Sequence, residues 1–283
     1  MATSPGYGER CVLRGVINRE TAKGESRSPD PRRLSAVAAL VRRHDRDRFQ
    51  TALFAPAGRR EALFALYAFN YEIARVRETV SEPVLGQIRL QWWRESIAAA
   101  FEDGPVRGHI VVEPLTAAIR THGLTRAHFD RLIDAREGDL DEAPLVSLAD
   151  LESYAEATSA RLVYLALESL GVRDPAAESA GFHIGIAYAL AGLLRAIPYR
   201  ARIGRPLVPA EIAVTASRHL ASARAQRRAR TRSALPALLP AILAERSLTR
   251  LQRVGFDPFD PALAVRDTMQ SWRLALATLR NRY

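Results

Sequence analysis

The sequence predicts an all-α protein. From Leu34 onward, apolar residues recur at three- and four-residue steps, which is the period of helices with one buried face. Alternating patterns typical of strands are absent, and proline or glycine separates the helical segments, as at Pro56 and Gly171. The chain has 283 residues, 48% of them hydrophobic, which is enough for one large core or two modest domains. We expect a single helical domain over residues 34–283.

Residues 1–33 are expected to form a disordered tail, or an over-long start to the chain. They are polar, they contain scattered Gly, Pro and Ser, and they sustain no helical period. Helices are expected at 34–45, 47–56, two segments hinged near Pro83 within 59–94, 114–121, 124–135, 151–170, 176–197, 211–232, 235–246 and 266–279.

Two segments carry expectations about the core. Residues 176–197 are almost wholly apolar, so this helix should lie at the centre of the fold, with Pro198 ending it. The neighbours Trp92 and Trp93 cannot both face one side of a helix. We expect one to be buried and the other to lie at a boundary or an interface.

Arginine dominates the charge of the chain. The sequence has 41 basic and 31 acidic residues, a net charge of +10, and Lys23 is its only lysine. A GC-rich coding bias explains this composition without any function. The alternative is a surface or pocket for anions, because the arginine fork matches phosphate and carboxylate. In either case the charge favours anionic partners.

The sequence also limits the compartment and the relation to a membrane. The single cysteine, Cys11, excludes an intramolecular disulfide and a cysteine-based zinc site. No uncharged apolar run approaches the roughly 18 residues that cross a bilayer. We therefore expect a protein that is soluble or peripheral.

Five segments, taken in order, resemble the squalene/phytoene synthase family. They are LFAPAGRREALFALYAFN, IRLQWWRESI, LESYAEATSARLVYLALESLG, the apolar helix that ends in GLLRAIPYR, and GRPLVPAEI. The resemblance implies the isoprenoid synthase fold, an all-α prenyl-synthase bundle around a central cavity. It also implies descent from enzymes that condense two prenyl diphosphates head to head.

The chemistry of that family implies magnesium held by carboxylates. A departing pyrophosphate must be neutralised, and Mg²⁺ takes oxygen ligands, which two aspartate-rich motifs supply from facing helices. Here the first motif falls on Ala74, Arg75 and Glu78, and the second falls on Ala196 and Arg200. Only Glu78 is acidic. We therefore expect no magnesium cluster, no other cofactor and no catalytic residue.

Two alternatives stay open. An active prenyltransferase would need other carboxylates, for instance Glu72 turned inward beside Glu78, and Mg²⁺ as its cofactor. If the protein is not such an enzyme, we expect Glu78 to be a solvated helix residue that pairs with a neighbouring arginine. The second alternative is a protein that binds an isoprenoid or another lipid.

Other contacts that the family makes with pyrophosphate are also changed. Its paired serines align with Asp47 and Phe49, and the arginine after its LYAF-like segment aligns with Tyr71, whereas Arg195 is retained. Arg195 is expected either to cap the C-terminal carbonyls of its helix or to hold an anionic headgroup with neighbouring arginines. The candidate anion-binding or ligand-binding residues are Arg75, Arg195, Arg200 and Tyr71.

One branch of the family is matched more closely. The segments AFNYEIARVRETVSE, LQWWRE, DAREGDLDE, LLRAIPY and VGFDPFDPALA resemble the phytoene-synthase-like assembly factors of respiratory complex I and their bacterial relatives. That branch also lacks the aspartates. The resemblance implies a non-catalytic protein that helps to build the membrane arm of NADH:ubiquinone oxidoreductase, with a membrane subunit or an assembly intermediate as its partner. It implies a cytoplasmic location, or a peripheral one on the inner membrane.

Residues 212–244 contain several arginines and no acid. A basic helix of this kind docks on anionic lipid or nucleic acid, or forms a merely solvated face. No aromatic residue is interleaved and no nucleic-acid motif accompanies the arginines, so we expect no nucleic-acid partner. Arg224, Arg227 and Arg228 are the candidates for contact with an anionic membrane.

Overall fold

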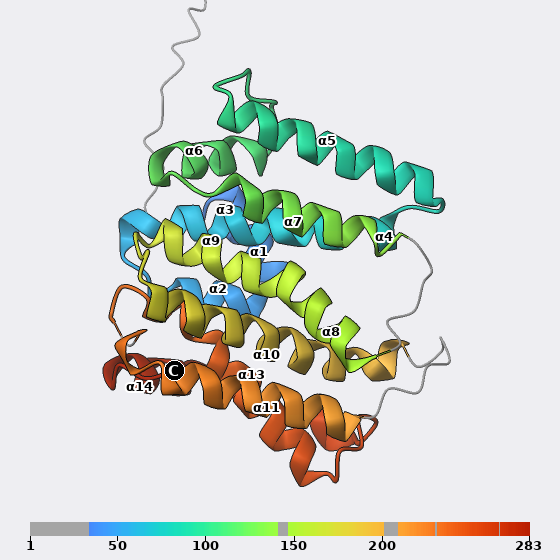
Figure 1. Ribbon diagram of the computed structural model, residues 1–283, viewed down its shortest axis with the longest axis vertical. Coiled ribbons are helices and arrows are strands. Elements are labelled where there is room, and N and C mark those ends of the chain that lie inside the picture. Colours follow the sequence, from blue (N-terminus) through green and yellow to red (C-terminus); the bar gives the residue numbers. More distant parts are fainter. Residues whose placement is uncertain (1–33, 141–146, 201–208, 230, 266) are drawn as a thin grey trace, which may run out of the picture. The chain divides into compact units, whose positions relative to one another are not determined.

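A computed structural model of the protein describes residues 34–140, 147–200, 209–229, 231–265 and 267–283, although the side chains of 199, 200 and 227 are not described. Leu34–Tyr283 form one compact unit, and the described residues contain helices and no strands (Figure 1). The all-α prediction is confirmed. The predicted tail at residues 1–33 lies outside the described residues.

The helices of the first half are α1 (Ala36–His44), α2 (Arg46–Ala52), α3 (Ala57–Ala74), α4 (Val76–Thr79), α5 (Pro83–Phe101), α6 (Val112–His122) and α7 (Arg126–Glu137). Those of the second half are α8 (Leu148–Ala155), the π-helical turn η1 (Glu156–Ala160), α9 (Arg161–Ser169), α10 (Pro175–Arg200), α11 (Pro209–Ala225), the 3₁₀ turn η3 (Arg227–Ala229), α12 (Leu235–Leu238), α13 (Pro240–Arg253), the 3₁₀ turn η4 (Pro261–Ala264) and α14 (Gln270–Leu279).

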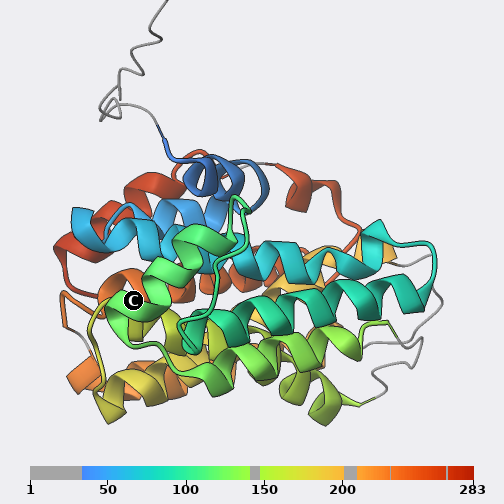
Figure 2. The same ribbon diagram turned by 90° about the horizontal axis from the view of Figure 1, so that it is seen from above.

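Helix α10 lies at the centre of the bundle, as its apolar sequence predicts. It packs against α9, α11 and α13, and Ile184, Ala187 and Leu190 are fully buried (Figures 1 and 2). By length and composition, Pro175–Pro198 is the one stretch among the described residues that could cross a membrane. However, 56% of its most apolar 18-residue stretch is buried inside the fold, so this part of the helix belongs to the core.

Several predicted helix limits were wrong. Pro198 lies inside α10 instead of ending it, because in the last turn a proline removes only one hydrogen bond. The helix predicted for 211–232 ends at Ala225 and continues as η3. The segment 235–246 is divided into α12 and α13 at Pro240, which has no N–H to continue a helix but suits a first turn. The last helix begins at Gln270 rather than at 266.

The predicted helix 151–170 is one helical course with a π-helical turn in its middle. It comprises α8, η1 and α9, and it ends where Gly171 adopts a φ of 76°. Helix α10 packs tightly against this wide turn. A methyl group added at Gly185 would lie 2.6 Å from the backbone nitrogen of Ala160. Sequence periodicity cannot reveal such a turn, since one extra residue in a turn barely shifts the apolar pattern.

Helix α3 supplies much of the remaining core. Every residue from Ala62 to Asn70 is buried, and the ring of Phe69 meets Trp93 edge-on at 5.3 Å. Trp93 is buried while Trp92 is partly exposed, as predicted for the pair. Helix α3 therefore has a fixed position when its last residues reach the candidate site.

Candidate functional site

The five former metal-motif positions lie on the last residues of α3, on α4 and on the last turns of α10. Both segments lie at the same end of the bundle, on the right of Figure 1. Ala74 and Ala196 are half-buried, and Glu78 is exposed. The backbone of Arg200 belongs to α10, but its side chain lies outside the described part of the structure.

Glu72 and Glu78, the two acids named for the enzyme alternative, have different surroundings. Glu72 is buried and faces two guanidinium groups, with Arg75 at 3.6 Å and Arg89 at 3.9 Å. A carboxylate compensated in this way has no need of a metal ion. Glu78 lies six residues further along the chain, in α4, and its side chain is exposed.

Arg75 is engaged with its own helix. Its Nη1 donates to the Tyr71 hydroxyl at 3.3 Å, and its guanidinium lies 5.3 Å from the centre of the Tyr71 ring. The His44 ring stacks on the Tyr71 ring, with the two ring centres 4.3 Å apart. Burial, together with the positive charges of Arg43 and Arg75, lowers the pKa of His44. The group is a packed stack of aromatic rings and a cation.

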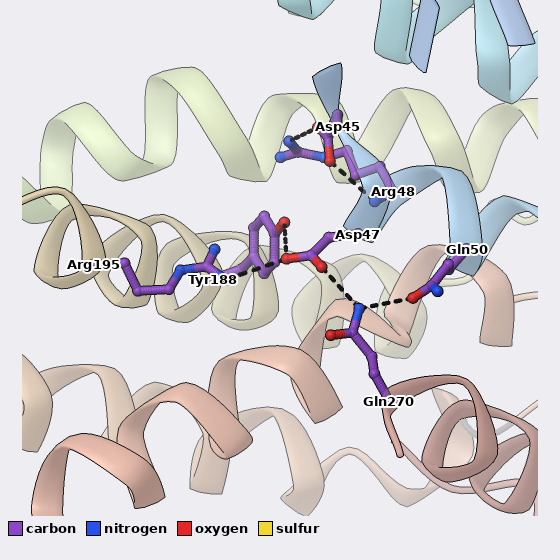
Figure 3. Close-up of polar contacts among 7 residues, drawn as sticks. All are labelled: Asp45, Asp47, Arg48, Gln50, Tyr188, Arg195 and Gln270. Carbon is purple, nitrogen blue, oxygen red and sulfur yellow. Dashed lines mark hydrogen bonds and ion pairs between the residues drawn. The ribbon is translucent and has the colours of Figure 1, made fainter. Parts of the chain in front are cut away.

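Arg195 is paired with an acid of α2. Its Nη1 donates to Asp47 Oδ2 at 3.2 Å, and the same carboxylate oxygen accepts from the Tyr188 hydroxyl at 3.3 Å (Figure 3). Arg195 thus contacts Asp47 and Tyr188, whereas Arg75 contacts Tyr71 and Glu72, so the two arginines have different partners. The charge of this retained arginine is therefore neutralised within the protein.

The other oxygen of Asp47 holds the C-terminal helix. Gln270, at the start of α14, donates from Nε2 to Asp47 Oδ1 and to Gln50 Oε1, each at 2.8 Å (Figure 3). The sequence signals that were available for this site were an acid, Asp47, at a position that aligns with a serine of the family, and the retained Arg195. Nothing in the sequence pointed to Tyr188 or Gln270, because each lies more than a hundred residues from Asp47.

A buried cation fills the interior beside this ion pair. Arg48 donates to Asp45 at 2.8 Å and lies 4.9 Å from the centre of the Tyr188 ring (Figure 3). Burial raises the pKa of Tyr67, which lines the same space, to about 12. The cavity between Arg48, Tyr67 and Tyr188 has a volume of about 10 Å³, room for about one water molecule.

The residues around the former site do not suit magnesium. Mg²⁺ requires several oxygen ligands, usually with two or more carboxylates. Among the described residues, no group of three or more His, Cys, Asp or Glu side chains could hold a metal ion. Asp47 is occupied by Arg195, and Glu72 is occupied by Arg75 and Arg89.

The basic segment is also neutralised in part. Arg224 Nη1 lies 2.7 Å from Glu245, and Arg218 Nη2 lies 3.3 Å from Glu152. These acids come from α13 and α8, outside the acid-free stretch of sequence. Arg228 is exposed, whereas the side chain of Arg227 lies outside the described residues. The continuous basic helix that was considered for membrane contact does not form, because α11 ends at Ala225.

Relatives that match more than four fifths of this chain are named as assembly factors. The human protein "NADH dehydrogenase (ubiquinone) complex I, assembly factor 6" is 33% identical over 268 residues, which is 83% of this chain and 80% of that protein. Its Drosophila melanogaster homolog is 30% identical over 278 residues, covering 87% and 83%. The presqualene diphosphate synthase of Rhodopseudomonas palustris is 29% identical over 160 residues, 56% of each chain.

Solved structures of the same fold are synthases. A dehydrosqualene synthase in complex with a ligand superposes with a TM-score of 0.74 at 15% identity, covering 86% of this chain and 94% of that one. Squalene synthase HpnC from Alicyclobacillus acidocaldarius gives a TM-score of 0.69 at 20% identity, covering 79% and 94%. The sequence model described as squalene/phytoene synthase matches residues 41–216. The chain therefore belongs to the squalene/phytoene synthase family and has its all-α isoprenoid synthase fold.

Proposed function

We propose that this protein is a non-catalytic member of its family that assists the assembly of respiratory complex I. The observation that carries the proposal is the ion pair between Asp47 and Arg195, two positions that the resemblance to the family assigns to pyrophosphate contacts. The names of the relatives that match more than four fifths of the chain support the assembly role.

The electrostatics support the absence of catalysis. A diphosphate that approached Arg195 would meet the carboxylate of Asp47, which already lies 3.2 Å from that guanidinium. Two anions at one cation repel each other strongly when both are poorly hydrated. Bound Mg²⁺ would normally relieve such repulsion, but the former ligand positions carry Ala74, Arg75 and Ala196. We propose that the protein uses neither Mg²⁺ nor another cofactor.

The partner that we propose is a membrane subunit or an early intermediate of the membrane arm of complex I. The protein would meet it at the inner membrane, from the cytoplasmic side, as a peripheral protein. The net charge of +10 favours this location, because the inner leaflet carries anionic lipids.

Deletion of the gene in its own organism, followed by complementation, tests the proposal. We expect the deletion to abolish assembled complex I on native gels and NADH:ubiquinone activity in membranes, while succinate oxidation stays normal as a control. Normal complex I in the deletion strain would refute the assembly role.

The same strain tests whether the protein is catalytic. Glu78→Ala removes the last acid among the five motif positions, and this exposed side chain can be changed without harm to the fold. We expect this variant to restore complex I as well as the wild type does. If it accumulates normally but fails to restore complex I, the non-catalytic reading is wrong.

A further inference from the structure

Helix α14 exposes a continuous apolar face. Four large hydrophobic residues at steps of three and four occupy it, with 71% of Trp272 and 82% of Leu279 exposed. We call them the α14 stripe; its members are Met269, Trp272, Leu276 and Leu279. The opposite side of α14 packs on the protein, because Leu274 and Ala277 are buried. The helix is therefore apolar on both sides, and the fold uses only one of them.

The surroundings of the α14 stripe are cationic. Residues 261–283 contain four arginines and one acid, Asp267. The Asp267 carboxylate forms ion pairs with Arg246, at 3.0 Å, and with Arg273, at 3.5 Å. Arg280 and Arg282 are exposed at the end of the helix. An apolar stripe bordered by arginines is typical of helices that lie in the interface of an anionic membrane.

A cationic groove lies along the inner edge of α14. It has a volume of about 450 Å³, and Phe49, Leu53 and Leu274 are among its apolar lining. Arg42 and Arg46 also line it, and neither forms an ion pair with another described residue. Two guanidinium groups with no counter-ion among the described residues suit the phosphates of lipid headgroups at a membrane surface.

The former diphosphate site anchors this helix. Gln270 at its start is bound by Asp47, and Ser271 accepts a hydrogen bond from Gln50 at 3.1 Å. Because Asp47 also holds Arg195 of the central helix α10, the position of α14 is fixed relative to the core. The side chains that replace a substrate site thus position an apolar surface.

We propose that the α14 stripe docks on an anionic lipid bilayer, with Trp272 and the leucines entering the interface and Arg42 and Arg46 meeting headgroup phosphates. The inference deepens the proposed function and rests on it, since it names the surface by which an assembly factor would reach a membrane. A second copy of the chain fits less well, because stripe-to-stripe contact would bring the arginines of both copies together. Residues 1–33 also fit less well, since their seven basic and four acidic residues give them the same sign of charge.

Vesicle binding of the purified full-length chain tests the proposal. Co-sedimentation is measured with vesicles of phosphatidylcholine alone and of phosphatidylcholine with phosphatidylglycerol, and a blue shift of tryptophan fluorescence reports insertion. We expect binding to the anionic vesicles that is weakened by salt. The double variant Leu276→Gln/Leu279→Gln should bind roughly tenfold or more weakly, and Arg42→Gln/Arg46→Gln should lose most of the preference for anionic lipid.

A matched control changes exposed apolar residues elsewhere. Val84 and Ile88 lie on α5, at the opposite edge of the bundle in Figure 1, and both are exposed. The variant Val84→Gln/Ile88→Gln should bind vesicles as the wild type does. Circular dichroism and thermal unfolding confirm that each variant is folded before binding is compared.

Three results would overturn the inference. They are no binding of the wild type to anionic vesicles, equal loss of binding in the α5 control, and a dimer in solution that the α14 variant dissociates.

Failure of this docking surface is distinguishable from failure of the proposed function. If vesicles are not bound but the deletion strain still lacks complex I, only the docking surface is wrong. If vesicles are bound but the deletion strain assembles complex I, the assembly role is wrong.

Discussion

Asp47 connects more of the candidate site than any residue that the family motifs singled out. It accepts hydrogen bonds from Arg195, Tyr188 and Gln270, which belong to two helices distant in sequence. Burial lowers the pKa of Arg195, but the charges of Tyr188 and Asp47 outweigh this effect and the pKa is raised. The guanidinium therefore stays charged and needs its counter-ion.

Removing Asp47 should destabilise the protein measurably. We expect Asp47→Ala to lower the free energy of unfolding by about 1–2 kcal/mol, because three donors lose an ionised acceptor, although Arg195 is half exposed and can reach water. Urea unfolding followed by circular dichroism measures the change. Asp130→Ala is the control: among the described residues this half-exposed acid pairs with Arg126 alone, at 3.7 Å, and its loss should change stability by less than about 0.5 kcal/mol. Equal effects would mean that Asp47 is no more than a surface charge.

At the scale of elements, α10 packs tightly against the π-helical turn η1. Gly185 leaves no space for a side chain against the backbone of Ala160. Backbone cannot move aside as a flexible side chain can, so a methyl group there must push the two helices apart.

Gly185→Ala should therefore lower the free energy of unfolding by about 1–3 kcal/mol. The same substitution at Gly58, in the first turn of α3, meets no atom within 4 Å. Gly58→Ala should be neutral or should raise stability by about 0.5 kcal/mol, because alanine loses less backbone entropy on folding. Thermal and urea unfolding of both variants make the comparison. A neutral Gly185→Ala would show that the packing of α10 on η1 is looser than described.

A histidine pair links α10 to α11. The Nδ1 atoms of His183 and His219 lie 2.9 Å apart, and His219 Nε2 lies 2.9 Å from Glu152 on α8. Since a carboxylate only accepts, His219 donates to Glu152 from Nε2 and accepts from His183 at Nδ1. This arrangement leaves Nδ1 of His219 without a proton, whereas His183 can donate from Nδ1 in either protonation state.

The pair should make stability depend on pH. Burial and the neighbouring His219 lower the pKa of His183 from its usual 6.5. The unfolded chain therefore binds a proton more readily than the folded one, so this contribution to stability is complete above about pH 6.5 and is lost as the pH falls below that value. We expect the free energy of unfolding to fall between about pH 7.5 and about pH 5.5, and to fall less in His183→Asn. An identical fall in the variant would assign the effect to other histidines.

At the scale of the whole molecule, the interior between α2, α3 and α10 is tightly filled. Arg48, Tyr67 and Tyr188 leave only about 10 Å³ between them. An isoprenoid chain needs a pocket of a few hundred Å³. The buried rings and guanidinium would have to leave the core before such a chain could enter.

Farnesyl diphosphate should consequently leave the thermal unfolding midpoint unchanged, with or without Mg²⁺, because a ligand that does not bind the native state cannot stabilise it. It should also release no pyrophosphate. A family enzyme with intact aspartate motifs, such as a dehydrosqualene synthase, provides the positive control. Magnesium-dependent release of pyrophosphate would restore the enzyme alternative, and stabilisation without turnover would favour a lipid-binding protein.

The sequence by itself determined the all-α class, the central place of α10 and the loss of acid at Ala74, Arg75 and Ala196. Each of these depends on local periodicity or on the residue type at one position. Only the tertiary structure decided that Asp47 neutralises Arg195, because 148 positions separate the two residues and helix packing alone brings them together. It also decided which side of α14 is exposed: the helix has apolar residues on both sides, and the core covers just one of them.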